Sequence, residues 1–181
     1  MRLSPSEEAP VLPADRREAP VVFSRLHRLR QQYRSQGIGI HYVIRGEVSY
    51  RIDHQPFKVC AGQYVLIGDG QEVAVQLEAD ERPVERLLVQ LPYPQVQAMY
   101  KELRATIQDP CEDPFAETNG KVQVVEHVYP VQGNVLGQLL HELSQSPACQ
   151  RELSARDGEA FLEELTERLL LTQGKVFQRL A

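Results

Sequence analysis

Short runs of β-branched and aromatic residues, separated by glycine, proline and aspartate, fill the middle of the chain. Asp53-His54-Gln55, between two of these runs, is typical of a hairpin turn. Runs of this length at such close spacing predict the antiparallel strands of a sandwich or small barrel. The predicted strands are Ile38–Arg45, Val48–Ile52, Phe57–Cys60, Tyr64–Ile67, Val73–Leu77 and Val84–Leu91.

After Pro92 the hydrophobic positions recur every three or four residues, which predicts an amphipathic helix. Pro94 is suited to the first turn of this helix. Its apolar face consists of Val96, Met99, Tyr100, Leu103 and Ile107. Residues 108–121 contain prolines and predict a loop, and Val122–Tyr129 predicts a further strand.

Two more helices are predicted near the end of the chain. The first has Asn134 as its N-cap and ends before Pro147. The second begins at Ser154, whose spacing to Asp157 resembles a capping box, and Gly174 is a candidate break or kink near its far end. Both helices carry leucine-rich faces, so both need an apolar surface that covers them.

The domain organisation follows from these patterns and from one shift in composition. Residues 1–22 hold prolines among charged residues, which predicts a flexible N-terminal arm. Residues 23–131 are expected to form a barrel with a packed helix, and residues 132–181 a helical dimerisation segment.

Composition narrows the classes of function. With 181 residues and a formal net charge of −5, the chain has no basic field for nucleic acid, so by itself it is not expected to bind DNA. Its 3 cysteines match no metal-binding spacing, and reduced thiols are expected. The sequence shows no apolar stretch of membrane-spanning length and no signal-peptide core, so we predict a cytoplasmic protein without membrane contact.

Glycine spacing relates the strand region to a known fold. The run Gly62–Val73 keeps the spacing of the second cupin motif, and Gly46 can close the first motif. The chain therefore resembles the cupins. This resemblance implies a fold that is mainly β with α: a double-stranded β-helix (jelly-roll) barrel followed by a helix and a C-terminal helical hairpin.

The metal-binding positions of the cupin motifs hold no ligands in this chain. The glutamate position falls on Gly39, the last histidine on Val73, and the first two histidines on Tyr33 and Ser35, or on Gln32 and Arg34 with a longer gap. Because a metal needs several N, O or S donors converging on it, we expect no metal and no cofactor. A stand-alone cupin enzyme or a metal-dependent small-molecule binder stays open as the alternative.

Several features together resemble the N-terminal sensor half of AraC-family transcription regulators over about residues 20–180. They are the segments Ile44-Arg45-Gly46-Glu47 and Cys60-Ala61-Gly62-Gln63-Tyr64-Val65-Leu66, the proline-opened helix and the late helical hairpin. The resemblance implies a small-molecule effector bound inside the barrel and a homodimer formed through the late helices. It also implies DNA binding only through a separate helix-turn-helix domain that is not in this chain.

Strand alternation indicates which side chains line the barrel. If the glutamate position at Gly39 faces inward, so do His41, Val43 and Arg45, provided that no bulge intervenes. The ligand-binding candidates are His41, Val43, Arg45, Tyr64, Val73 and Val75. Alternatives remain open for three of them: Arg45 as a surface ion pair, His41 as a structural histidine and Tyr64 as a packing residue.

The last helix carries the candidates for a subunit interface. Its apolar stripe is close to a heptad rhythm and must be covered, either by the chain's own barrel or by a second copy. The dimer-interface candidates are Phe161, Leu162, Leu165, Leu169 and Val176. No nucleophile with a base, no paired carboxylates and no nucleotide-binding motif are recognisable, so the sequence predicts no catalytic residues and no enzyme.

Overall fold

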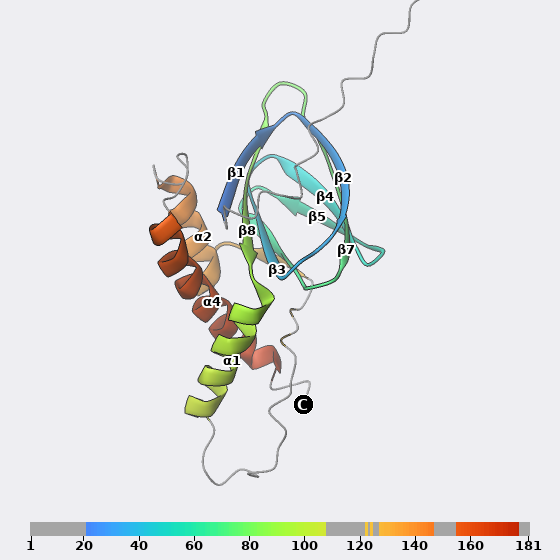
Figure 1. Cartoon of the computed structure of the whole chain (residues 1–181). Helices are drawn as coiled ribbons and strands as arrows, with labels where there is room; N and C mark the ends of the chain where they lie inside the picture. Colours follow the sequence, from blue (N-terminus) through green and yellow to red (C-terminus); the bar gives the residue numbers. More distant parts are fainter. Residues whose placement is uncertain (1–20, 108–121, 123, 125–126, 147–154, 178–181) are drawn as a thin grey trace, which may run out of the picture.

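The computed structural model describes residues 21–107, 122, 124, 127–146 and 155–177, and within this part the chain forms a two-sheet barrel flanked by helices (Figure 1). The strands are β1 Val21–Leu26, β2 Arg28–Arg34, β3 Ile38–Arg45, β4 Glu47–Ile52, β5 Gln55–Cys60, β6 Gln63–Ile67, β7 Glu72–Glu78, β8 Val84–Leu91 and β9 Val128–Pro130. The helices are α1 Tyr93–Ile107, α2 Val135–Gln145 and α4 Ala155–Phe177. Residues 1–20 of the predicted arm and the predicted loop at 108–121 lie outside the described residues, whereas Val21 and Val22, the last two residues of the predicted arm, belong to β1.

Two antiparallel sheets face each other. One has five strands in the order β1-β8-β3-β6-β9, and the other has four in the order β2-β7-β4-β5. In Figure 1 the three helices lie on one side of the barrel, next to β1 and β8, and the four-stranded sheet lies on the far side. This arrangement confirms the predicted jelly-roll barrel with helices.

All six predicted strands are present, within a residue or two of the predicted ends. Two strands were not predicted, β1 and β2. β2 was missed because Arg28, Arg30 and Arg34 alternate with only one aliphatic residue, Leu29, so the run lacks an apolar face. Of the further strand predicted at Val122–Tyr129, the described residues 122, 124 and 127 are not in a strand, and β9 pairs with β6 over Val128–Pro130.

Turn chemistry fixes the hairpin between β4 and β5. Asp53 and His54 adopt positive φ angles of 44° and 73°, as a tight two-residue hairpin turn requires. The side chain of Asp53 accepts hydrogen bonds from the Glu72 backbone N–H at 2.9 Å and from the Gln71 amide at 3.0 Å. The turn is therefore tied to the start of β7, which closes one end of the four-stranded sheet.

The helices begin and pack as local sequence dictates. Asn134 caps α2, accepting a 2.6 Å hydrogen bond from the backbone N–H of Gly137. Gly137 is needed because a Cβ there would come within 2.2 Å of the Val131 carbonyl oxygen. α4 continues through Gly174 to Phe177, so the glycine does not end the helix. No described helix is both long and apolar enough to cross a membrane.

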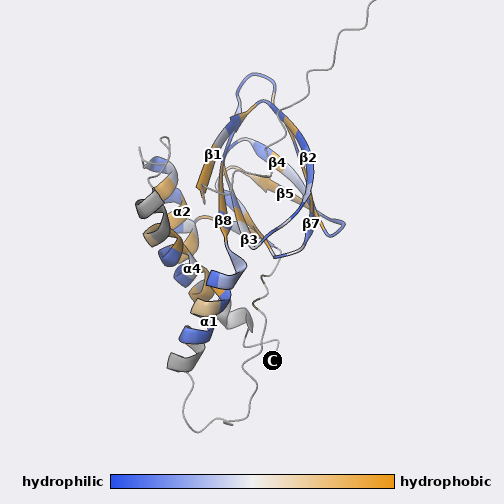
Figure 2. Cartoon of the chain, in the orientation of Figure 1, coloured by the Kyte–Doolittle hydropathy of each residue, from blue (hydrophilic) through white to orange (hydrophobic). Residues whose placement is uncertain are grey.

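Strand alternation divides the buried residues into two hydrophobic cores. The helix-side core lies between the five-stranded sheet and the helices, and includes Ile40, Tyr42, Leu87, Leu140 and Leu165. Figure 2 shows hydrophobic residues on β1 and β8 along the side of the barrel beside the helices. The interior core lies between the two sheets, and includes Val43, Ile52, Val65, Val73 and Val75.

The dimer-interface candidates on α4 mostly belong to the helix-side core. Leu162, Leu165 and Leu169 are buried within the chain and packed with residues of the sheet and of α2. These three leucines therefore pack within the chain itself, and whether α4 also forms a subunit interface stays a prediction. Phe161 is partly buried against the same core. The side chain of Val176 lies outside the described residues.

Candidate functional site

The barrel interior contains a group of polar side chains, which we call the interior polar cluster: Arg86, Tyr50, His41, Ser24 and Tyr33. They come from five different strands, β8, β4, β3, β1 and β2, and they meet because each lies at an inward position of its strand. The surrounding interior core is aliphatic. Such a group in an apolar shell is how small-ligand sites are usually built.

Arg86 is the centre of this cluster and is only 2% exposed. Its Nε donates a 2.9 Å hydrogen bond to Ser24 Oγ, and its positive charge acts to lower the pKa of the nearby Tyr50 hydroxyl. The contact with Ser24 uses one of its five N–H donors. Among the described residues Arg86 forms no ion pair, although a buried charge ordinarily needs a counter-charge.

The preceding residue, Glu85, has the opposite environment. It faces outward from β8, on the same side of the sheet as Leu87 and away from Arg86. Its carboxylate lies 3.0 Å from Arg25 and 3.4 Å from Arg45. The Glu85 carboxylate thus pairs with two other arginines and forms no ion pair with Arg86.

His41 and the two tyrosines of the cluster are uncharged near neutral pH. Burial, followed by the nearby Arg86, lowers the pKa of His41 to about 3. Burial likewise raises the pKa of Tyr50 and of Tyr33, although Arg86 acts in the opposite direction on both. His41 Nδ1 lies 3.3 Å from the Tyr50 hydroxyl, with the rings edge to face. The cluster therefore carries a single positive charge, on Arg86.

Four of the six ligand-binding candidates lie in the barrel interior. Val43, Val73 and Val75 belong to the interior core, each 2% exposed or less, and His41 lies beside Tyr50. Their inward orientation follows the predicted alternation along β3 and β7. Whether they contact a ligand stays a prediction.

Two candidates lie elsewhere. A register shift between Val43 and Arg45 on β3 places Arg45 opposite Glu85, on the outer face, with its side chain 56% exposed. The alternation argument assumed a strand without a bulge, and β3 has one between Val43 and Arg45. The interior position predicted for Arg45 is therefore wrong. Tyr64 is also misplaced, because Val65 and Ile67 take the inward positions of β6. The Tyr64 hydroxyl donates to Asn134 Oδ1 at 3.0 Å, and its ring stacks on Tyr129 in the helix-side core.

Arg86 and Tyr50 were not identified from the sequence. A signal for Arg86 was present: Leu87, Val89 and Leu91 form one apolar face of β8, which places Arg86 on the other face, towards the interior. A single arginine in a strand is ordinarily a surface residue, and only the second sheet shows that this face is covered.

The positions that match the cupin metal ligands hold no metal-binding set among the described residues. Tyr33 and Val73 are directly paired in the β2–β7 ladder. At Gly39 a Cβ would lie 3.4 Å from His41 Nε2, so the glycine leaves room for the histidine ring. Within the described part of the chain no three His, Cys, Asp or Glu side chains are grouped as a metal site.

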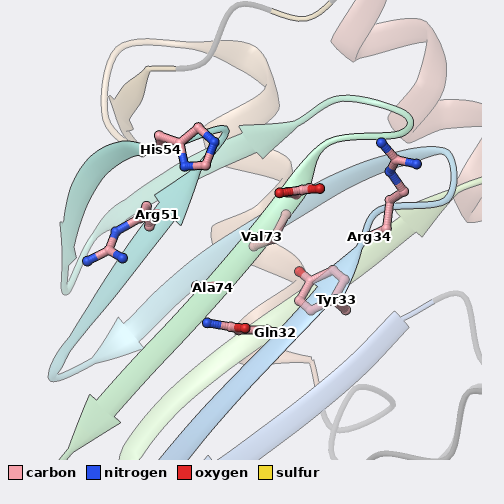
Figure 3. Close-up of a pocket in the computed structure, with 8 residues that line it drawn as sticks. Gln32, Tyr33, Arg34, Arg51, His54, Val73 and Ala74 are labelled. Atoms are coloured by element: carbon pink, nitrogen blue, oxygen red, sulfur yellow. The ribbon is translucent and has the colours of Figure 1, made fainter.

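An open pocket of about 510 Å³ lies beside β2, β7 and the end of β4. Figure 3 shows its labelled residues: Gln32, Tyr33 and Arg34 from β2, Val73 and Ala74 from β7, and Arg51 and His54 from β4 and the turn after it. Most of these side chains are exposed, whereas Tyr33 and Val73 also belong to the interior core. Tyr33 therefore connects the open pocket with the interior polar cluster.

Solved structures similar to this chain overlap with it only in part. The EutQ protein of Clostridium difficile is 17% identical over 40% of this chain and 55% of its own, with a TM-score of 0.35. A protein from Rhizobium leguminosarum is 15% identical over 40% of this chain and 68% of its own, with a TM-score of 0.36. An RmlC-like cupin with a double-stranded β-helix fold from Methanocaldococcus jannaschii is 16% identical over 41% of this chain and 69% of its own, with a TM-score of 0.34. This chain thus spans about half the length of EutQ.

No curated protein matches the sequence. A family model does: the AraC-like ligand binding domain matches residues 24–170, from within β1 to within α4. The match covers most of the barrel strands and the helices that pack on them. This chain therefore belongs to the family of AraC-like ligand-binding domains.

Proposed function

We propose that this chain is the effector-sensing module of a transcription regulator, and that its small-molecule ligand binds in the barrel interior at the interior polar cluster. The observation that carries the proposal is Arg86, a buried guanidinium without an ion-pair partner among the described residues. A purely structural core gains nothing from such a charge, whereas a ligand site needs fixed polar groups within an apolar wall. The role is binding without catalysis.

The proposed signal passes from the barrel to the helices through β3. His41 faces the cluster, while its neighbour Tyr42 faces the helix-side core, where its hydroxyl lies 3.5 Å from His141 Nδ1 on α2. A ligand that moves β3 therefore moves the surface on which α2 packs. For this to regulate anything, the ligand must bind one arrangement of the helices more tightly than the other.

The proposed output is a homodimer that aligns DNA-binding domains supplied by another part of the regulator. Since Leu162, Leu165 and Leu169 are buried within the chain, the second copy has to pack on other residues of the helices. Among the described residues, the large hydrophobic side chains that are exposed are Leu171 on α4 and Val135 on α2, at 57% and 49%. Light scattering should return a dimer at tens of micromolar, and a monomer at that concentration contradicts this part of the proposal.

A thermal-shift screen tests the sensing role. Small organic acids, sugars and nucleotides are added to the purified chain and to Arg45→Gln, an outer-face control on the same barrel. We expect at least one class to raise the melting temperature of both proteins equally. A chain that responds to no class, and that copurifies with a stoichiometric transition metal, contradicts the proposal and favours the metal-dependent alternative.

A further inference from the structure

The charges around Arg86 restrict the chemistry of the ligand. Among the buried residues that the structure describes, the side chains of charged type other than histidine are Glu85 and Arg86, and Glu85 is occupied by Arg25 and Arg45 on the outer face. No carboxylate of the described residues forms an ion pair with Arg86. The interior therefore holds one cation whose counter-charge is missing from this part of the chain.

The hydrogen-bonding groups around Arg86 suit a carboxylate. A guanidinium presents its donors as a planar fork that matches two carboxylate oxygens. Arg86 Nε donates to Ser24, which leaves the two terminal NH2 groups for a carboxylate. The Tyr50 hydroxyl is near enough to the guanidinium for Arg86 to act on its pKa, and it can donate to the same oxygens. His41 Nδ1 lies 3.3 Å from this hydroxyl.

The rest of the interior limits the number of charges and polar groups on the ligand. With only Arg86 charged, a dianion such as phosphate would bring in a second, uncompensated charge. A sugar needs many hydrogen-bond partners, while the surrounding residues Ile52, Val43, Val73 and Val75 are aliphatic. An apolar body with one carboxylate satisfies both conditions.

Tyr33 is shared by the open pocket and the interior polar cluster. It is only partly buried, lines the open pocket of about 510 Å³ and interacts electrostatically with both Tyr50 and Arg86. Arg34, Arg51 and His54 around the same pocket favour the approach of an anion, although the exposed Glu72 opposes it.

We propose that the effector is a small apolar monocarboxylate whose carboxylate pairs with Arg86 and Tyr50 and whose body packs against the interior core. This inference rests on the proposed function, since it names the class of ligand for the same site. It adds a requirement that the proposed function does not make, namely that removal of the ligand's negative charge abolishes binding.

Isothermal titration calorimetry tests whether the ligand's charge is required. The probes are benzoate and hexanoate, together with their neutral amides benzamide and hexanamide. At least one acid should bind wild type, with its amide at least about tenfold weaker. Arg86→Met should weaken that acid at least about tenfold and leave the amide unchanged, while Arg45→Gln should bind like wild type. Tyr50→Phe, which removes one hydroxyl, should weaken the acid by a smaller factor and covers the case in which Arg86→Met does not fold.

The outcomes separate the two proposals. If acid and amide bind equally, or if sugars bind and both acids do not, the monocarboxylate inference is overturned while the sensing role stands. If the acids bind equally to wild type and Tyr50→Phe, and to Arg86→Met where it folds, the site is elsewhere and the inference is overturned as well. If no acid, amide, sugar or nucleotide binds, both proposals fail.

Discussion

The two faces of the five-stranded sheet differ in what they bury. The helix-side face packs Ile40, Tyr42 and Leu87 against helices of the same chain, and its hydroxyls are tied to neighbours, as Tyr64 is to Asn134. The interior face of the same strands carries Arg86 and His41. Because both faces are equally buried, packing alone does not explain the polar residues. Under the proposed function, one face serves stability and the other serves binding.

The largest expected effect comes from the helix-side face. Leu165 of α4 is fully buried in the helix-side core, so Leu165→Ala should lower the free energy of unfolding by about 3 kcal/mol through lost burial and a cavity. Leu171→Ala, at an exposed position of the same helix, should change it by less than about 0.5 kcal/mol. Urea denaturation measures both. Equal effects would mean that Leu165 is not buried in the helix-side core as described.

Acid should destabilise the protein through the interior face. The folded pKa of His41 is about 3 and its unfolded value is 6.5. Between these values the unfolded chain binds more protons, so stability rises with pH and is lost as the pH falls from about 6.5 towards 3. The contribution of His41 approaches about 1.4 kcal/mol per pH unit inside that window.

Denaturation midpoints between pH 4 and pH 7 measure this slope. His41→Gln should flatten it, whereas His54→Asn, in the exposed turn after β4, should leave it unchanged. A slope that survives in His41→Gln assigns the acid sensitivity to other groups and removes His41 from the buried cluster.

The sequence predicted the layout of the fold better than the site. Alternation and turn residues gave six strands, and the cap at Asn134 gave the start of α2, because these signals are local. β2 was not predicted because its charged residues alternate with too few aliphatic ones. The position of Arg45 was predicted wrongly because one bulge reverses which face a side chain takes. Arg86 was missed because its burial depends on a second sheet.

A smaller effect should separate the two buried tyrosines. Tyr64→Phe removes the hydrogen bond to Asn134 and should lower stability by about 1 kcal/mol without changing ligand affinity. Tyr50→Phe should change affinity, because its hydroxyl lies between His41 and Arg86. Denaturation and calorimetry on the same preparations compare them. If ligand affinity depended on Tyr64 and not on Tyr50, the ligand would bind at the helix-side face and not in the barrel interior.

The smallest effect is expected outside both faces. Arg45 is more than half exposed, and Glu85 keeps its shorter contact with Arg25 when Arg45 is replaced. Arg45→Gln should therefore change stability by less than about 1 kcal/mol, as exposed ion pairs usually do. Thermal denaturation at low and high salt measures this, and a large loss would mean that the outer ion pairs hold the barrel together.

The central claim is that the ligand binds between the two sheets. The most direct measurement is a crystal structure of the chain with the ligand that stabilises it most. Our account predicts the ligand's polar group within hydrogen-bond distance of Arg86 and Tyr50, with its apolar part against Val73 and Val75. A ligand held only in the open pocket by Arg51 and His54, or among the helices, with the Arg86–Ser24 hydrogen bond unchanged and nothing added to it, contradicts the account.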